Sequence, residues 1–151
     1  EQHFEQIGLT GYASAALNLA NLYDKNGKLP NINRLVDVYN VTSLLTGLSF
    51  WVHDVAQLPE SVRITVATWG EPFDPMGWAQ LPAIIAGEYI LLGDDGRAYG
   101  RDIKQSEQSK VSEDTRDVLI YIQGNANTPK ELLDSALNEV KENIIQFLST
   151  N

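Results

Sequence analysis

The stretch LPNINRLVDVYNVTSLLTGLSFWVHD, residues 29–54, constrains the fold most, because its hydrophobic pattern changes at a single glycine. Before that glycine, apolar residues recur at helical spacing, and Asn33 stands where an N-terminal cap belongs. After Gly47, apolar and aromatic residues follow one another as in an extended segment. The pattern predicts a helix that closes at Gly47 and leads into extended chain. The buried face of this helix is expected to carry Leu35, Val38, Tyr39, Leu44 and Leu45.

Further segments have strand character. Residues 63–69 (RITVATW) alternate with period two and are rich in β-branched side chains, which predicts a strand with one buried face. The sequence Asp94-Asp95-Gly96 predicts a hairpin turn, since glycine accepts a positive φ. A continuous apolar run at 118–122 is typical of a central strand. We expect the helix at 34–46 to pack on one sheet that contains residues 63–69, 89–92, 97–101 and 118–122.

Two more helices are predicted at the ends of the chain. Residues 12–25 are rich in Ala and Leu, and Gly27 follows where a C-terminal cap belongs. Thr128-Pro129-Lys130-Glu131 forms a capping box with proline at the first helical position. The apolar stripe of the last helix comprises Leu133, Ala136, Leu137, Val140, Ile144 and Leu148, and we interpret it as cover for a sheet. The fold class expected is therefore α+β, with a mixed or antiparallel sheet flanked by helices.

Length and composition are those of one globular domain spanning 1–151, with 43% hydrophobic and 21% charged residues. The chain starts at Glu1 rather than Met, so we expect a processed or trimmed N-terminus. No apolar stretch reaches the length of a membrane span and no signal peptide opens the chain, so we expect a cytoplasmic protein with no membrane partner. Eleven basic and 20 acidic residues give a net charge of −9, which argues against a long basic groove for a nucleic-acid backbone and against DNA as a partner.

Several chemistries lack their sequence signals. Two histidines, His3 and His53, and no cysteine cannot supply a typical zinc site. Neither a glycine-rich phosphate loop nor a GxSxG nucleophile elbow occurs. No cofactor and no metal are therefore expected, and a site would consist of polar side chains that converge on a pocket.

Four segments, in order, carry a resemblance to a known family. They are Val36, Asp37, Asn40, Gly47 and Asp54 in the helix segment, GEPFDPMG at 70–77, GEYILLGDDG at 87–96, and SEQSKVSEDTRDVLIYI at 106–122. Together they resemble the tRNA-binding B3/B4 domain, the editing domain of the phenylalanyl-tRNA synthetase β subunit, which also exists as free-standing proteins. The resemblance covers about residues 28 to 148 and implies the B3/B4 fold.

The resemblance also implies candidate site residues. Asn40 falls on an asparagine that lines the aminoacyl pocket in the family, although a helix asparagine can equally be structural. Glu107 falls on the pocket glutamate, with a solvated loop acid as the alternative. Trp51 stands where the synthetase has a histidine, and His53 either substitutes for it or is a structural histidine. We take Glu107 and His53 as catalytic candidates, and Asn40, Trp51 and Glu88 as substrate-binding candidates, with the pocket beside Asn40 and Trp51 and with Glu107 at its rim.

One departure from the family weakens the catalytic hypothesis. A glycine loop that precedes the pocket glutamate in the synthetase is replaced by RDIKQS at 101–106, so the approach of backbone amides to a reacting carbonyl is in doubt. Of the basic segment that free-standing relatives carry there, Arg101 and Lys104 remain.

Three functions stay open from the sequence. The first is recognition of an aminoacyl group on tRNA, with hydrolytic editing in trans and association with translation proteins. The second is non-catalytic binding or sensing of a free amino acid or a related small ligand, which the acidic charge favours. The third is an interaction module without a ligand.

Overall fold

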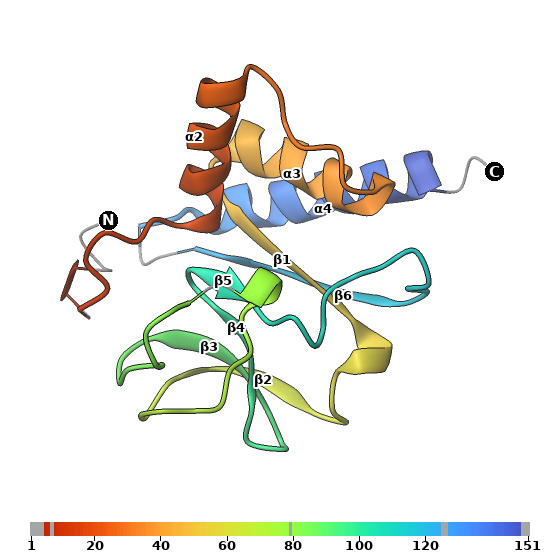
Figure 1. Cartoon of the computed structure of the whole chain (residues 1–151). Coiled ribbons are helices and arrows are strands. Elements are labelled where there is room, and N and C mark those ends of the chain that lie inside the picture. Colours follow the sequence, from red (N-terminus) through yellow and green to blue (C-terminus); the bar gives the residue numbers. More distant parts are fainter. Residues whose placement is uncertain (1–4, 7, 79, 125–126, 149–151) are drawn as a thin grey trace. The chain divides into compact units, whose positions relative to one another are not determined.

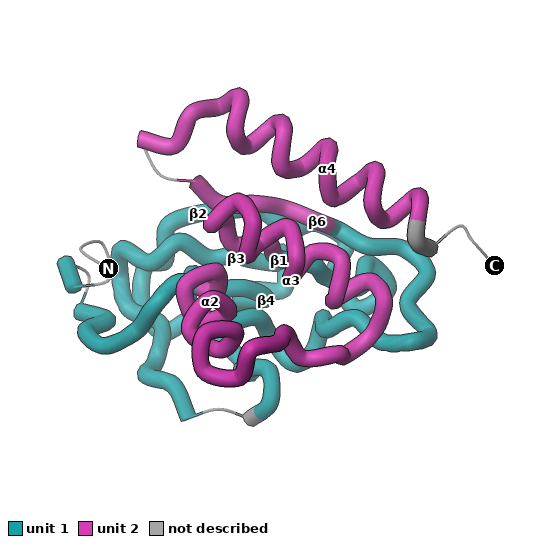
Figure 2. Tube along the Cα trace, turned by 90° about the horizontal axis from the view of Figure 1, so that it is seen from above, with its two compact units in different colours: residues 1–14, 51–119 teal, residues 15–50, 120–151 magenta. Residues whose placement is uncertain are grey.

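The computed structural model describes residues 5–6, 8–78, 80–124 and 127–148, without the side chains of Trp78, Phe147 and Leu148. The chain folds as two compact units, each built from two segments: residues 1–14 with 51–119, called unit 1, and residues 15–50 with 120–151, called unit 2 (Figure 2). No helix among the described residues is long and apolar enough to cross a membrane.

Unit 2 holds the three helices α2 (Ala15–Asn26), α3 (Arg34–Thr46) and α4 (Lys130–Leu148), and α3 packs against both of the others (Figures 1 and 2). The predicted ends of α3 are confirmed. The side chain of Asn33 accepts a hydrogen bond from the Val36 N–H (2.9 Å). Gly47 has φ 70°, and its N–H donates to the Ser43 carbonyl. Local capping chemistry therefore places α3. The helix predicted at 12–25 is α2, which begins three residues later.

The predicted buried face of α3 is partly wrong. Leu45 is 72% exposed, whereas Val36, Thr42 and Ser43 are buried. The two polar residues can be buried because each hydroxyl donates to a carbonyl, Thr42 to Val38 and Ser43 to Leu48. The core of unit 2 comprises Leu48, Phe50, Ala136 and Val140, with the partly buried Tyr39, Ile120, Ile122, Leu133 and Ile144.

The last helix is confirmed with most of its stripe. Ala136 and Val140 are buried and Leu133 and Ile144 pack against them, as the period predicted. Leu137 is 40% exposed and lies off this face. The side chain of Leu148 lies outside the described residues.

The strands form two sheets rather than one. β1 (Ser49–Asp54) and β6 (Val118–Gln123) form a two-stranded sheet. A four-stranded antiparallel sheet has the order β2 (Val62–Val66), β3 (Tyr89–Gly93), β4 (Ala98–Arg101) and β5 (Lys104–Gln105). The prediction of one sheet that includes 118–122 is therefore wrong. The apolar run correctly indicated a strand, but its partner, β1, is distant in sequence and no local pattern specifies it.

The hairpin between β3 and β4 is confirmed. Gly96 has φ 78°, and the Gly93 N–H donates to the Arg97 carbonyl across the turn. The side chain of Asp95 accepts from the Arg97 N–H (3.0 Å), which fixes the loop further.

β2 departs from its prediction. It ends at Val66 rather than Trp69, and none of its residues is buried, so the expected buried face is absent. Two clusters form the core of unit 1: Ala67, Ile84, Ile90 and Ala98 with Phe73 and Leu92, and Leu9 and Ile103 with Tyr12, Leu81 and Ile85.

Candidate functional site

A cavity of about 420 Å³ lies in unit 1, between the segment 71–84 and the end of β4. Its size suits a small organic ligand, and such sites usually combine apolar walls with a few polar groups. The lining residues are Glu71, Phe73, Pro75, Gln80, Leu81, Pro82, Ala83, Ile84 and Arg101.

Arg101 is the buried polar anchor of this cavity. Its guanidinium donates to both carboxylate oxygens of Glu88, from Nε (2.8 Å) and from Nη2 (2.7 Å). Nη1 donates to the Pro82 carbonyl (2.8 Å), and the group lies 5.6 Å from the centre of the Phe73 ring. A buried ion pair of this kind is tolerated only when further hydrogen bonds satisfy both partners. The pair therefore fixes one wall of the cavity and leaves it without an uncompensated positive charge.

Glu88, the residue before β3, supports that wall through Arg101 without lining the cavity. It is fully buried, and its Oε1 also accepts from the Ile85 N–H (2.8 Å). The expected substrate-binding role of Glu88 stays a prediction. In the structure its carboxylate positions Arg101 and the loop that contains Ile85.

Glu71 carries the remaining charge of the cavity lining. Its Oε1 accepts from the N–H (2.8 Å) and the hydroxyl (2.9 Å) of Thr68. Burial raises the pKa of this carboxyl, but the hydrogen bonds from the 68–71 turn outweigh burial and lower the pKa below its ordinary value. Because Arg101 is already paired with Glu88, Glu71 is the charged group among the described lining residues that has no ion-pair partner there.

Glu107 lies next to the cavity wall rather than in its lining. Its Oε2 accepts from the Gly77 N–H (2.8 Å), and its Oε1 pairs with Lys110. The hydrogen bond from Lys110, with that from Gly77, lowers the pKa of Glu107, so the carboxyl is ionised at neutral pH. Pro75, a lining residue, forms a β-bridge with Ser106. Glu107 is thus held beside the wall as a ready hydrogen-bond acceptor.

His53 and Trp51 both lie in β1 and are buried, at 0% and 4% exposure. Nδ1 of His53 is 2.7 Å from the Ser109 hydroxyl, and burial lowers the pKa of the imidazole to about 4. The ring is therefore neutral at pH 7. Asn40 is half-buried in α3 and belongs to unit 2, whereas the other four candidates belong to unit 1. The roles expected of Asn40, Trp51 and His53 stay predictions.

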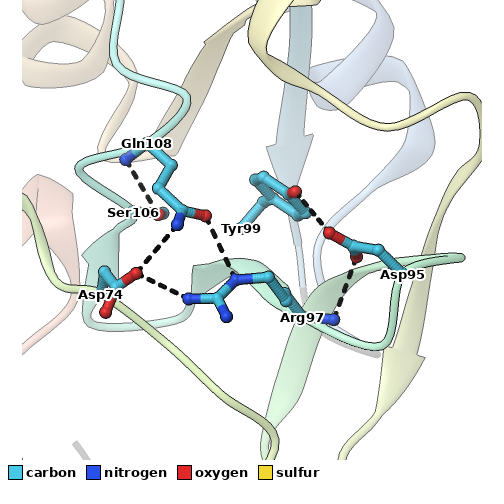
Figure 3. Close-up of polar contacts among 6 residues, drawn as sticks. All are labelled: Asp74, Asp95, Arg97, Tyr99, Ser106 and Gln108. Atoms are coloured by element: carbon cyan, nitrogen blue, oxygen red, sulfur yellow. Dashed lines mark hydrogen bonds and ion pairs between the residues drawn. The ribbon is translucent and has the colours of Figure 1, made fainter.

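A polar network that the sequence did not suggest braces the segments beside the cavity. Figure 3 shows Arg97 donating to Asp74 (2.7 Å) and to Gln108 (3.3 Å), while Gln108 also donates to Asp74 (2.9 Å). The backbone N–H of Gln108 donates to the Ser106 hydroxyl in the same view. This network joins the β3–β4 turn to the segments that contain Pro75 and Glu107.

The sequence contained a partial signal for the cavity. Glu71 and Phe73 lie in GEPFDPMG, and Glu88 lies in GEYILLGDDG, two of the segments that carry the family resemblance. The pairing of Glu88 with Arg101 had no local signal, because 13 residues separate the two partners. The segment RDIKQS supplies a buried guanidinium and also Gln105, which donates to the Val52 carbonyl (2.6 Å).

The four-stranded antiparallel sheet with its cavity in unit 1 and the three helices of unit 2 define an α+β protein. The B3/4 domain family model matches residues 6–142, so this chain belongs to the B3/4 domain family.

A solved structure supports the same fold. The chain is similar to an N-terminal fragment of the phenylalanyl-tRNA synthetase β subunit from Pyrococcus horikoshii, with a TM-score of 0.64 and 17% identity. The match covers 75% of this chain and 39% of that one, so the chain spans about two-fifths of the length of the fragment. A comparison with curated proteins found no match. The predicted α+β fold and the family resemblance are confirmed.

Proposed function

We propose that this domain recognises the aminoacyl group at the end of a tRNA, with hydrolytic editing in trans as its reaction. The single observation that carries the proposal is a cavity that combines apolar side chains with one carboxylate that has no counter-ion among the described lining residues. An aminoacyl ester offers a side chain and a protonated α-amino group but no free carboxylate, so it complements both features. Membership of the B3/4 family and the likeness to a synthetase fragment support this substrate class.

In the proposed complex, the side chain of the amino acid lies among Phe73, Leu81 and Ile84, and the α-ammonium approaches Glu71. Arg101 stays paired with Glu88 and keeps the wall rigid, which preorganises the cavity for its ligand. The preferred amino acid is therefore apolar.

The proposed hydrolysis requires a group that orients a water molecule towards the ester carbonyl. Glu107 is the candidate acceptor for a proton of this water, because its carboxylate is ionised and is held beside the cavity wall. A carboxyl with a lowered pKa is a weak base, so we expect slow turnover. His53 is neutral and can contribute only if local opening exposes it.

A second function, binding of a free amino acid without catalysis, is favoured by the net charge of −9. A free amino acid adds a carboxylate, however, and Arg101 is the cation among the described lining residues and is already neutralised by Glu88. The charge balance of the cavity therefore favours the ester over the free acid.

The test is a deacylation screen over correctly and incorrectly charged tRNAs. We expect slow release of an apolar amino acid, and at least tenfold slower release by Glu107→Gln. The control is Glu60→Gln, which removes the same charge from an exposed residue of unit 1. His53→Ala belongs in the same screen, and the proposed catalytic residues are wrong if both Glu107→Gln and His53→Ala keep full activity. If the unchanged domain deacylates nothing, binding without catalysis becomes the better account.

Such a function places the protein with the translation machinery. Aminoacyl-tRNA and translation proteins are therefore its proposed partners, and the cytoplasm is its proposed compartment. Co-purification with aminoacyl-tRNA synthetases or elongation factors would test the association.

A further inference from the structure

Strand β2 leaves one backbone edge open. It is the outermost strand of its sheet (Figure 1). The Ser61 carbonyl accepts from Asp94 N–H, and the Ala67 N–H donates to the Glu88 carbonyl, so these two positions face β3. Backbone groups alternate in direction along an antiparallel strand, so Val62, Ile64 and Val66 direct their N–H and C=O groups away from β3. Within the described part of the chain, no strand pairs with this edge.

The same edge exposes apolar side chains. Ile64 is 54% and Val66 is 48% exposed. Proteins usually protect such an edge with proline, a bulge, charged side chains or a cover, because it otherwise pairs with another strand. Arg63 is the one charged residue of 62–66. Residues 62–66 contain no proline, and their register with β3 runs without a shift. β2 is therefore a regular strand with an apolar face and an unused row of backbone groups.

We propose that β2 pairs with β2 of a second copy of this chain, antiparallel and around a two-fold axis at Ile64. Ile64 then lies opposite Ile64 of the other copy, and Val62 lies opposite Val66. These are the residues whose backbone groups point outward, so each pair can exchange both of its N–H···O bonds. Two four-stranded sheets join into one of eight strands, and such isologous contacts are the commonest way for a chain to associate with itself.

Charge disfavours one neighbouring register. Moving the axis from Ile64 to Arg63 places Arg63 directly opposite Arg63 of the other copy, where two guanidinium groups repel each other. Moving the axis to Thr65 instead places Thr65 opposite Thr65, and in that register Thr65→Glu would weaken the dimer rather than tighten it. With the axis at Ile64, Arg63 lies opposite Thr65, and no pair between residues 62 and 66 brings like charges face to face. The pair of Arg63 and Thr65 is of the non-hydrogen-bonded kind, in which side chains approach most closely. A charged side chain at position 65 therefore interacts strongly with Arg63 of the other copy.

The test is sedimentation equilibrium of the full 151-residue chain, from about 10 to about 200 µM, the range in which weak association is measurable. We expect a monomer–dimer equilibrium that tightens between about 0.05 and about 0.5 M salt, because two chains of net charge −9 repel each other less when screened. Thr65→Glu should tighten the dimer by about tenfold through two symmetric pairs with Arg63, and Thr65→Lys should weaken it by a similar factor.

The relative dimer affinities of Thr65→Glu and Thr65→Lys distinguish the proposal from a simple effect of net charge. Glutamate makes an acidic chain more acidic, so net charge alone predicts that Thr65→Glu weakens the dimer. Asn138→Glu and Asn138→Lys, at an exposed position of α4, make the same charge changes away from β2. Arg63→Glu combined with Thr65→Lys places opposite charges at the same two positions with their signs exchanged, and it should tighten the dimer about as much as Thr65→Glu does.

Two results would overturn the proposal. One is a monomer at every concentration and salt level, and the other is a dimer in which the Thr65 variants behave like the Asn138 controls. Ile64→Lys should abolish the dimer. If that variant does not fold, the opposite effects of the two Thr65 variants still show whether β2 pairs with β2 of a second copy.

Discussion

At the scale of single residues, the buried pair of Arg101 and Glu88 organises the cavity, since both side chains are at most 1% exposed and fully bonded. We expect Glu88→Gln to lower the free energy of unfolding by about 3 kcal/mol or more, because the substitution leaves a buried guanidinium without a counter-charge. Denaturant titration measures the loss. Asp134→Asn, which removes the exposed partner of Lys130 on α4, is the matched control and should change stability by less than about 0.5 kcal/mol.

His53 makes the stability of the folded chain depend on pH. Burial lowers its pKa from 6.5 to about 4 in the folded chain, so below pH 6.5 the unfolded chain binds a proton that the folded chain does not. Because of this difference in pKa, the free energy of unfolding is highest above pH 6.5. It falls by about 3 kcal/mol in all as the pH drops towards 4. Unfolding measured at several pH values should show this fall in the unchanged protein and not in His53→Gln. Equal pH profiles for the two proteins would contradict the assigned burial.

At the scale of elements, the caps of α3 make a simple test of local structure. Asn33→Ala removes the side-chain acceptor for the Val36 N–H and should cost about 1 kcal/mol of stability. Asn31→Ala changes an exposed residue before the helix and should cost almost nothing. Thermal or denaturant unfolding of the two variants gives the comparison, and equal stabilities would mean that the cap contributes little.

Elements governed by neighbours in sequence were predictable, and elements governed by distant partners were not. Asn33, Gly47 and Gly96 act through hydrogen bonds or φ values within a few residues, so their patterns specified helix ends and a turn. The strand at 118–123 was recognised, but its pairing with β1 joins residues more than 60 positions apart. The period-two alternation of side chains in the β2 segment likewise indicated a strand, but it did not indicate whether other residues cover that strand.

The site was predictable to a smaller extent. The family segments contain Glu71, Phe73 and Glu88, yet only the fold brings Glu88 to Arg101 and leaves Glu71 as the unpaired charge of the cavity lining. The pKa of His53 depends on burial, which the sequence does not give.

At the scale of the whole molecule, the net charge of −9 limits how a tRNA can be held. We expect weak binding of uncharged tRNA by the isolated chain, with the logarithm of the association constant falling by only about one or two units per decade of salt. Filter binding at several salt concentrations measures this slope. Tight binding with a steep slope would mean that a cationic surface contributes more than the composition indicates.

The central claim is that the cavity selects an aminoacyl group over a free amino acid, and calorimetric titration tests it most directly. The ligands are an amide-linked phenylalanyl-adenosine, which cannot be hydrolysed, and free phenylalanine. We expect the aminoacyl analogue to bind at least tenfold more tightly, and Glu71→Gln, but not Glu60→Gln, to remove most of that difference, because Glu71 supplies the charge that meets the α-ammonium. Equal affinities for the two ligands, or a preference for free phenylalanine, would contradict the account.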